Sequence, residues 1–277
     1  MKLRIFLPAT ERPEAGARFA WMLFDAHHAL LRQDVSTLAE IPPAEEVEAI
    51  VPASRVLFAR LKLPRVNPAT IRELLPFAVE DRLLADPSHI HAVAGRVNAR
   101  GETVVAVLDR EWLKAMLEAL ARYAMRPRKA WSEGALLASD GGEWNLVLAK
   151  HRGMLVDQDG VGVTFDRSAS SAFLLALRIA LDEASARGER PSAIRVHPER
   201  AEPLPDLATW AAEASMEFRS GAPWEKLAAG EPSAQAINLL QGDFAPRPTA
   251  RLGHIPAGAI ALALLIVGLE LGFVALD

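Results

Sequence analysis

Two turns in the sequence stand where a nucleotide-binding protein would hold phosphate, and neither has suitable residues. Pro8–Glu11 follows the first predicted strand, and His151–Gly153 follows a predicted strand at Trp144–Lys150. Phosphate-binding turns use glycine, because only glycine lets backbone N–H groups approach closely, and an aspartate there holds a metal ion. The first turn has neither residue at its strand end, and the second has no aspartate. We therefore expect no nucleotide cofactor and no hydrolysis.

Other candidates for chemistry have simpler explanations. The segment Asp157–Gly162 reads Asp-Gln-Asp-Gly-Val-Gly, which a hairpin turn explains without a ligand. His89 and His91 alternate on a predicted strand with Asp86 nearby, but no further ligand stands at a spacing typical of a metal site. Neither a G-x-S-x-G nor an H-E-x-x-H motif is present. The sequence predicts no catalytic residue, no metal site and no enzyme.

Composition excludes several further classes of protein. The 277 residues are 51% hydrophobic and 24% charged, an ordinary globular mixture with room for about two domains. The net charge of −4 offers no basic field for nucleic acid. Because the chain has no cysteine, it has no disulfide framework, no thiolate metal site and no cysteine nucleophile.

The second half of the chain has a regular pattern of predicted elements. Its order is β-β-β-α-β-α, with strands at Trp144–Lys150, Met154–Asp157, Val161–Phe165 and Ser192–His197 and helices at Ser168–Arg187 and Leu207–Ser215. Asp159-Gly160 predicts the hairpin between the second and third strands, and Gly188 is placed to end the long helix.

The first half opens in the same way. Its predicted strands are Leu3–Leu7, Phe19–Phe24, Ala29–Val35, Val47–Val51, Val56–Leu63, His89–Val97 and Thr103–Leu108, with helices from Asn67 to about Ala85 and at Glu111–Ala124. Three opening strands followed by alternating helices and strands, present twice, predict a duplicated α/β architecture, and the actin-like fold is built this way. The turn-rich stretch Arg126–Gly142 divides the halves, which we place at residues 1–125 and 143–240.

The C-terminal region is different in character. Residues 241–254 contain two prolines, two glycines and two arginines and are predicted to be a linker. Ile255–Leu276 follows with one charged residue, Glu270, and its 22 residues span about 33 Å as a helix, enough for a hydrocarbon core of about 30 Å. Its strong hydrophobes contribute roughly −5 kcal/mol to insertion, against at most about +3 kcal/mol for the carboxylate. We predict a transmembrane helix and a lipid bilayer as a partner.

The flanks and small residues of this span suggest its orientation and packing. Arg247 and Arg251 precede it, and the N-terminus has no signal peptide, so the large N-terminal part should be cytoplasmic. Gly268 and Gly272 lie on one helix face and could let a second helix approach. Since the chain stops at the far edge of the membrane, we expect the native protein to continue beyond Asp277.

A series of segments resembles protein L of the bacterial type II secretion system. Leu75–Val93 is similar to the stretch that marks its cytoplasmic part, and Ile50–Pro52 with Leu63-Pro64 resembles the segment before that helix. Thr103–Arg110 resembles the strand that follows, and Asn238–Phe244 (NLLQGDF) is similar to the signature before the family's membrane span. The similarities cover nearly the whole chain in the family's order.

The resemblance implies a degenerate actin-like fold without ATPase activity or cofactor, followed by one inner-membrane span with the N-terminal domain cytoplasmic. It also implies that the protein docks the N-terminal domain of the secretion ATPase (protein E), pairs with protein M and self-associates, serving protein export. The family's small periplasmic domain does not occur in this sequence. Glu80 and Asp81 are candidates for the docking surface, as is an exposed edge strand, but a solvated helix face is the simpler explanation of the two acids.

Two alternatives are weighed against this reading. An active actin-like ATPase or sugar kinase would need a phosphate-binding first turn, which Pro8–Glu11 does not provide. The related assembly protein of the type IV pilus machinery shares the fold and the anchoring role, but it lacks a membrane span and keeps a nucleotide-binding motif. The predicted span at Ile255–Leu276 argues against it.

Overall fold

The computed structural model divides the chain into two units, Met1–Ala245 and Pro246–Asp277. It describes residues 1–14, 16–64, 67–80, 86–98, 101–137, 142–167, 170–201 and 203–246. The predicted span at Ile255–Leu276, with Gly268 and Gly272, lies outside these residues. No helix in the described part of the chain has the length and apolar character needed to cross a membrane.

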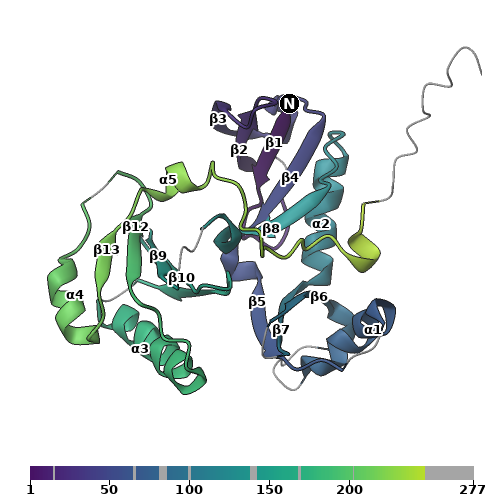
Figure 1. Cartoon of the computed structure of the whole chain (residues 1–277). Helices are drawn as coiled ribbons and strands as arrows, with labels where there is room; N and C mark the ends of the chain where they lie inside the picture. Colours follow the sequence, from purple (N-terminus) through teal and green to yellow (C-terminus); the bar gives the residue numbers. More distant parts are fainter. Residues whose placement is uncertain are drawn as a thin grey trace, which may run out of the picture. The chain divides into compact units, whose positions relative to one another are not determined.

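The first unit contains two five-stranded sheets with the same strand order (Figure 1). The first is β3-β2-β1-β4-β8, with strands β1 (Lys2–Phe6), β2 (Arg18–Phe24), β3 (Leu30–Thr37), β4 (Glu46–Val51) and β8 (Lys129–Ser132). The second is β11-β10-β9-β12-β13, with strands β9 (Trp144–Leu148), β10 (Arg152–Val156), β11 (Gly162–Asp166), β12 (Ile194–Pro198) and β13 (Phe218–Ser220).

Pairing directions repeat as well as order. In each sheet the first three strands in sequence are antiparallel, the fourth pairs in parallel with the first, and the fifth pairs in parallel with the fourth. This repetition confirms the duplicated mixed α/β architecture predicted from the sequence. The opening strands and the hairpin between β10 and β11 are also confirmed, each within about two residues.

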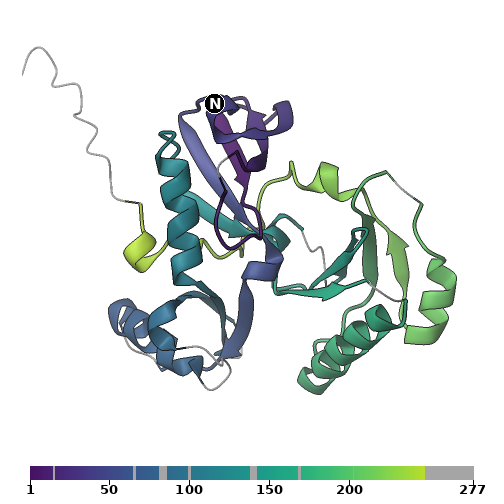
Figure 2. The same ribbon diagram turned by 180° about the vertical axis from the view of Figure 1, so that it is seen from behind.

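The first sheet buries one face against helix α2 (Arg110–Ala121). Alternation along β1 sends Leu3 and Ile5 to this face, where they join Leu113 and Met116 in the largest apolar cluster. The helix begins at Asp109, whose carboxylate accepts a hydrogen bond from the Trp112 backbone N–H at 2.8 Å. Figure 2 shows α2 running along this sheet from behind.

A three-stranded sheet is inserted between β4 and β8, with the order β5-β7-β6. Its strands are β5 (Leu57–Leu61), β6 (Ile90–Val97) and β7 (Thr103–Asp109), and helix α1 (Pro68–Ala78) packs against β6. Asn67 accepts a hydrogen bond from the Thr70 N–H at the start of α1. The helix contains Pro76, whose missing N–H removes one helical hydrogen bond, and it ends at Ala78 rather than near Ala85.

The second sheet carries the remaining helices, α3 (Ser170–Arg187), α4 (Leu207–Ala214) and the short α5 (Trp224–Leu227). Leu177, Leu181 and Ala184 of α3 pack on Leu146 and Val196 of the sheet. Between β3 and β4 of the first sheet, by contrast, the described chain forms only a short 3-10 turn, Leu38–Glu40.

Two boundaries differ from the sequence prediction. The predicted divider Arg126–Gly142 contains β8, so the first sheet extends past residue 125. Residues 241–245, predicted as linker, belong to the compact unit because their side chains pack on it, as described below. In both places a short segment gains its structure from distant partners, which local composition does not reveal.

Candidate functional site: the exit segment

Near the C-terminal end of the compact unit, the stretch Ile237–Phe244 packs on the body and is called the exit segment here. It is the path by which the chain leaves toward residue 246. Leu239 and Leu240 are 0% and 3% exposed and join the apolar core under the first sheet. Burying two leucines stabilises the docked position by roughly 3–6 kcal/mol before the cost of ordering is counted.

Backbone bonds attach the exit segment to the edge of β8. The Leu239 N–H donates to the Ala130 carbonyl at 2.8 Å. The side-chain oxygen of Asn238 accepts from the N–H groups of Ala130, at 3.0 Å, and Leu240, at 3.2 Å. The side-chain oxygen of Asn238 therefore takes the place of a backbone carbonyl from a neighbouring strand. The exit segment continues the hydrogen bonding of the first sheet beyond β8 without forming a regular strand.

His91 of β6 holds the same segment from the inserted sheet. Its Nε2 lies 2.8 Å from the Leu239 carbonyl oxygen, and the Phe244 ring meets its imidazole edge-on at 4.8 Å between centroids. Burial lowers the pKa of His91, and the bond to Leu239 offsets this only in part. His91 is thus a neutral donor in a structural contact. His89, which ends the short turn before β6, is exposed and does not share this environment.

The start of α2 provides a third attachment. Arg110 forms an ion pair with Asp243, and its guanidinium lies 5.9 Å from the centre of the Phe244 ring. Gly95 of β6 lies close to the exit segment: a Cβ there would lie 2.9 Å from Cδ1 of Ile237, so a larger residue would make the Ile237 side chain shift. A groove of about 490 Å³ runs beside it, between α1, β6 and residues 241–243.

The exit segment is therefore tied to three elements from different parts of the chain. Hydrogen bonds to β8, a bond to His91 of β6 and an ion pair with Arg110 of α2 share the attachment, so no single bond carries it. Sequence reasoning identified NLLQGDF as a signature but did not predict its docking, and it missed Ala130, Gly95 and Arg110. Only the run of Leu239 and Leu240 before a polar stretch signalled burial.

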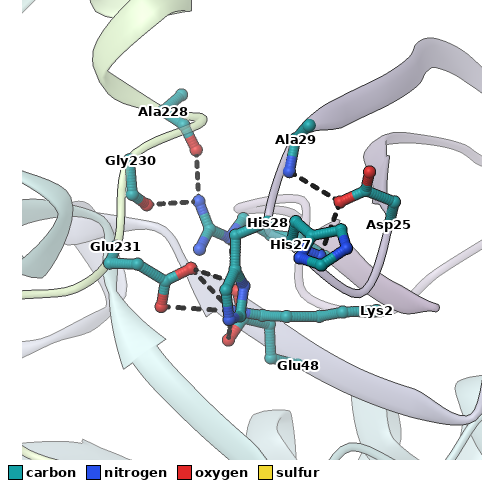
Figure 3. Close-up of polar contacts among 10 residues, drawn as sticks. Lys2, Asp25, His27, His28, Ala29, Glu48, Ala228, Gly230 and Glu231 are labelled. Carbon is teal, nitrogen blue, oxygen red and sulfur yellow. Dashed lines mark hydrogen bonds and ion pairs between the residues drawn. The ribbon is translucent and has the colours of Figure 1, made fainter.

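A second crossing segment, Ala222–Glu231, is held by a buried ionic network on the other face of the first sheet. Arg4, 0% exposed, donates to Glu48 at 2.5 Å and to the carbonyl oxygens of Ala228 and Gly230 at 2.6 and 2.7 Å. Lys2 lies between Glu48 and Glu231, at 3.2 and 3.1 Å (Figure 3).

The edge of this network is partly exposed to solvent. Glu231 also faces His28, with 3.3 Å between its carboxylate and Nδ1 (Figure 3). Burial acts to raise the pKa of Glu231, but the bond and charge of Lys2 outweigh it and hold the pKa below its usual range. Glu231 therefore stays ionised at neutral pH, and the network fastens the segment after α5 to β1 and β4.

The two turns considered for phosphate are engaged in other contacts. In the first, the Ala9 carbonyl accepts from Nε of Arg55 at 2.8 Å, and the Thr10 carbonyl accepts from Trp112 Nε1 at 2.8 Å. In the second, the His151 carbonyl accepts from the Arg167 backbone N–H at 2.9 Å. Gly153 lies in β10 under the ring of Phe165, where a Cβ would clash at 2.2 Å.

The Asp157 turn binds an arginine from the inserted sheet. Asp157 and Asp159 each lie 2.6 Å from Nη2 of Arg60 on β5. Asp157 also accepts the N–H groups of Asp159 and Val161, which forms the predicted turn. Burial raises the pKa of Asp157 to about 6, and the charge of Arg60 offsets only part of that rise. The sequence offered no sign of Arg60 as a partner.

Glu80 and Asp81 are the candidate docking residues predicted from the sequence. Glu80 is exposed just after α1, whereas Asp81 lies outside the described residues. Within the described ranges no group of three or more His, Cys, Asp or Glu side chains could hold a metal ion.

Comparison with known proteins now gives the family. The cytoplasmic domain of EpsL, an inner-membrane component of the type II secretion system of Vibrio cholerae, is 16% identical, with a TM-score of 0.64 over 88% of this chain and 99% of that one. A chain of the PilM–PilN type IV pilus biogenesis complex is 12% identical, with a TM-score of 0.59 over 81% and 89%. These likenesses show a shared fold. None of the curated protein sequences compared with the chain matches it.

The family model of type II secretion system protein L matches residues 14–247, a range that includes the second sheet, the inserted sheet, the exit segment and every strand of the first sheet except β1. The chain belongs to the family of type II secretion system protein L.

Proposed function

We propose that this chain is an inner-membrane platform component that docks the secretion ATPase and links it to the rest of the type II secretion machinery. The observation that carries the proposal is the exit segment. Leu239, Leu240, Asn238 and Asp243 fasten the route toward the predicted span to three elements of the body. A protein that holds a motor at a membrane needs such an attachment.

The body acts as a scaffold with a degenerate actin-like fold and no catalysis of its own. In support, the carbonyl groups of Ala9 and Thr10 are turned to Arg55 and Trp112, so this turn presents acceptors where phosphate would need donors. We expect calorimetric titration with ATP–Mg²⁺ to give no binding heat. A dissociation constant near about 10 μM would contradict this.

The predicted partners are the N-terminal domain of the ATPase (protein E), protein M of the same system and a second copy of the chain. For the ATPase we favour the outer face of α1. Phe77 and Leu74 are 63% and 43% exposed there, and Glu73 and Glu80 stand beside them. An exposed aromatic residue flanked by acids suits a basic partner surface with an apolar anchor pocket.

The membrane arrangement is a single pass, with the N-terminal domain in the cytoplasm and Asp277 on the periplasmic side. It is supported by Arg247 and Arg251 before the predicted span. A reporter enzyme active only in the periplasm should be active when fused after Asp277. If the C-terminal fusion is silent and an N-terminal fusion is active, the orientation is the opposite of the one proposed.

A role in the related type IV pilus machinery is the second candidate, favoured by the fold shared with the PilM–PilN structure. The two can be separated by giving the purified chain the ATPases of both systems in turn. Selective binding of the pilus ATPase would support the second candidate and contradict the first.

Membrane recruitment is the main test. The full chain and the secretion ATPase are produced together, and the membranes are collected. We expect the ATPase in the membrane fraction with the full chain. With Ile255–Leu276 deleted, it should be soluble but still bound to the chain. If the ATPase stays soluble and unbound while the full chain is in the membrane, the proposal fails.

The α1 face is tested in the same assay. The pair Leu74→Asp and Phe77→Asp should release the ATPase, with about a hundredfold loss of affinity. Leu31→Asp on β3, where the side chain is 55% exposed, is the matched control and should leave recruitment unchanged.

A further inference from the structure

We infer that the outer face of α3 is the surface through which two copies of this chain associate. The helix packs on the second sheet through Leu177, Leu181 and Ala184, yet Leu175 and Ile179 on the opposite side are 57% and 52% exposed. A helix that is apolar on both sides is expected to be covered on both sides. In the described part of the chain no element covers this side (Figures 1 and 2).

Charge on the same face points to a second copy as the covering partner. With 3.6 residues per turn, Arg178 and Asp182 lie on the same stripe as Leu175 and Ile179. Both are exposed, and neither has an ion-pair partner among the described residues. Arginine four residues before aspartate is the less favourable order for a pair within one helix, so both charges are left available.

These charges match when two α3 helices meet antiparallel about a twofold axis. With the axis level with Ala180, Arg178 of each copy faces Asp182 of the other, giving two equivalent ion pairs on one side. Leu175 then faces the level of Ser185 and Ala186, both exposed and small enough to receive it. The patch on one chain contacts the same patch on the other chain, as a closed twofold dimer requires.

One helix pair buries less than the roughly 1,200 Å² of a stable complex, so the contact is weak in dilute solution. Confinement to a membrane raises the local concentration and favours it. The inference rests on the proposed membrane anchoring only because anchoring raises the local concentration of the chain. It does not depend on ATPase recruitment, which is a separate property of the chain.

Thiol cross-linking tests the surface directly, because the chain has no cysteine. Ile179→Cys is introduced into the full chain in membranes and treated with a short bis-maleimide. Ile179 of each copy lies next to its counterpart in the dimer, so we expect cross-linking about tenfold faster than for Leu31→Cys, an exposed position on β3. Equal cross-linking rates at the two positions would overturn the inference. Lipid or another protein would then cover α3 in place of a second copy.

Charge reversal provides the second, independent readout. In the Ile179→Cys background, Arg178→Asp sets an aspartate opposite Asp182 in both of the equivalent pairs. The repulsion should slow cross-linking about tenfold or more. Adding Asp182→Arg restores opposite charges and should restore the rate. Failure of the double variant to recover would exclude the antiparallel pair. ATPase recruitment should be unchanged in all of them, which separates this surface from the docking function.

Discussion

The two halves of the molecule use the same strand framework but fasten the returning chain differently. In the first half, Arg4 of β1 and Glu48 of β4 form a buried ion pair that also binds the carbonyls of Ala228 and Gly230. In the second half, His197 of β12 bonds to Asn145 of β9 at 2.9 Å and to the carbonyl of Ala222 at 2.8 Å.

The corresponding strands thus hold the two ends of one crossing segment, with charge at one end and neutral groups at the other. A buried charge left without its partner costs more than a neutral polar group in the same position. The first half should therefore be the more sensitive to loss of a single side chain. It is also the half that binds the exit segment.

The largest effect is expected at the charged end. Glu48→Ala leaves Arg4, which is fully buried, without its carboxylate and should lower the free energy of unfolding by about 3–5 kcal/mol. Urea denaturation of the full chain in detergent measures it. The double variant Arg4→Met and Glu48→Met removes both charges and should lose less than the single change. An equal or larger loss in the double variant would refute the argument.

The exit segment comes next. Leu239→Ala removes a fully buried side chain and should cost about 2–5 kcal/mol, and amide exchange near Ala130 and His91 should quicken. Leu31→Ala, exposed on β3, should change little. If Leu239→Ala left both stability and exchange as they are, the docked position would not hold in solution.

The sequence predicts the elements that depend on local patterns and misses those that depend on contacts between residues far apart in the chain. β1, β2 and the Asp159-Gly160 hairpin are local patterns of alternation and turn residues, so they were predicted correctly. β8 was missed because four residues within a turn-rich stretch become a strand only by pairing with β4. The contacts of Arg60 with Asp157 and of Asn238 with Ala130 join residues about a hundred positions apart, and one sequence has no local signal for them.

The Asp157 contact sharpens the comparison through pH. Because burial raises its folded pKa from 3.8 to about 6, the folded state binds a proton more tightly than the unfolded state. That stabilisation is complete below about pH 4 and is lost as the pH rises through about 6. Asp157→Asn should remove this loss. Between pH 4 and pH 8, the free energy of unfolding should therefore fall by up to about 3 kcal/mol less in the variant than in the native chain. Parallel pH profiles for the two chains would contradict it.

The smallest effect is expected at the neutral end of the crossing segment. Asn145→Ala leaves Nε2 of His197, a residue 2% exposed, without its side-chain partner, and should cost about 1–3 kcal/mol. Burial lowers the pKa of His197, so its share of the stability is present above about pH 6.5 and is lost as the pH falls and the unfolded chain takes up the proton. Gln33→Ala, exposed on β3, serves as the control and should stay within about 0.5 kcal/mol. A loss at Asn145 as large as that at Glu48 would mean that position in the framework, and not charge, sets the cost of releasing the segment.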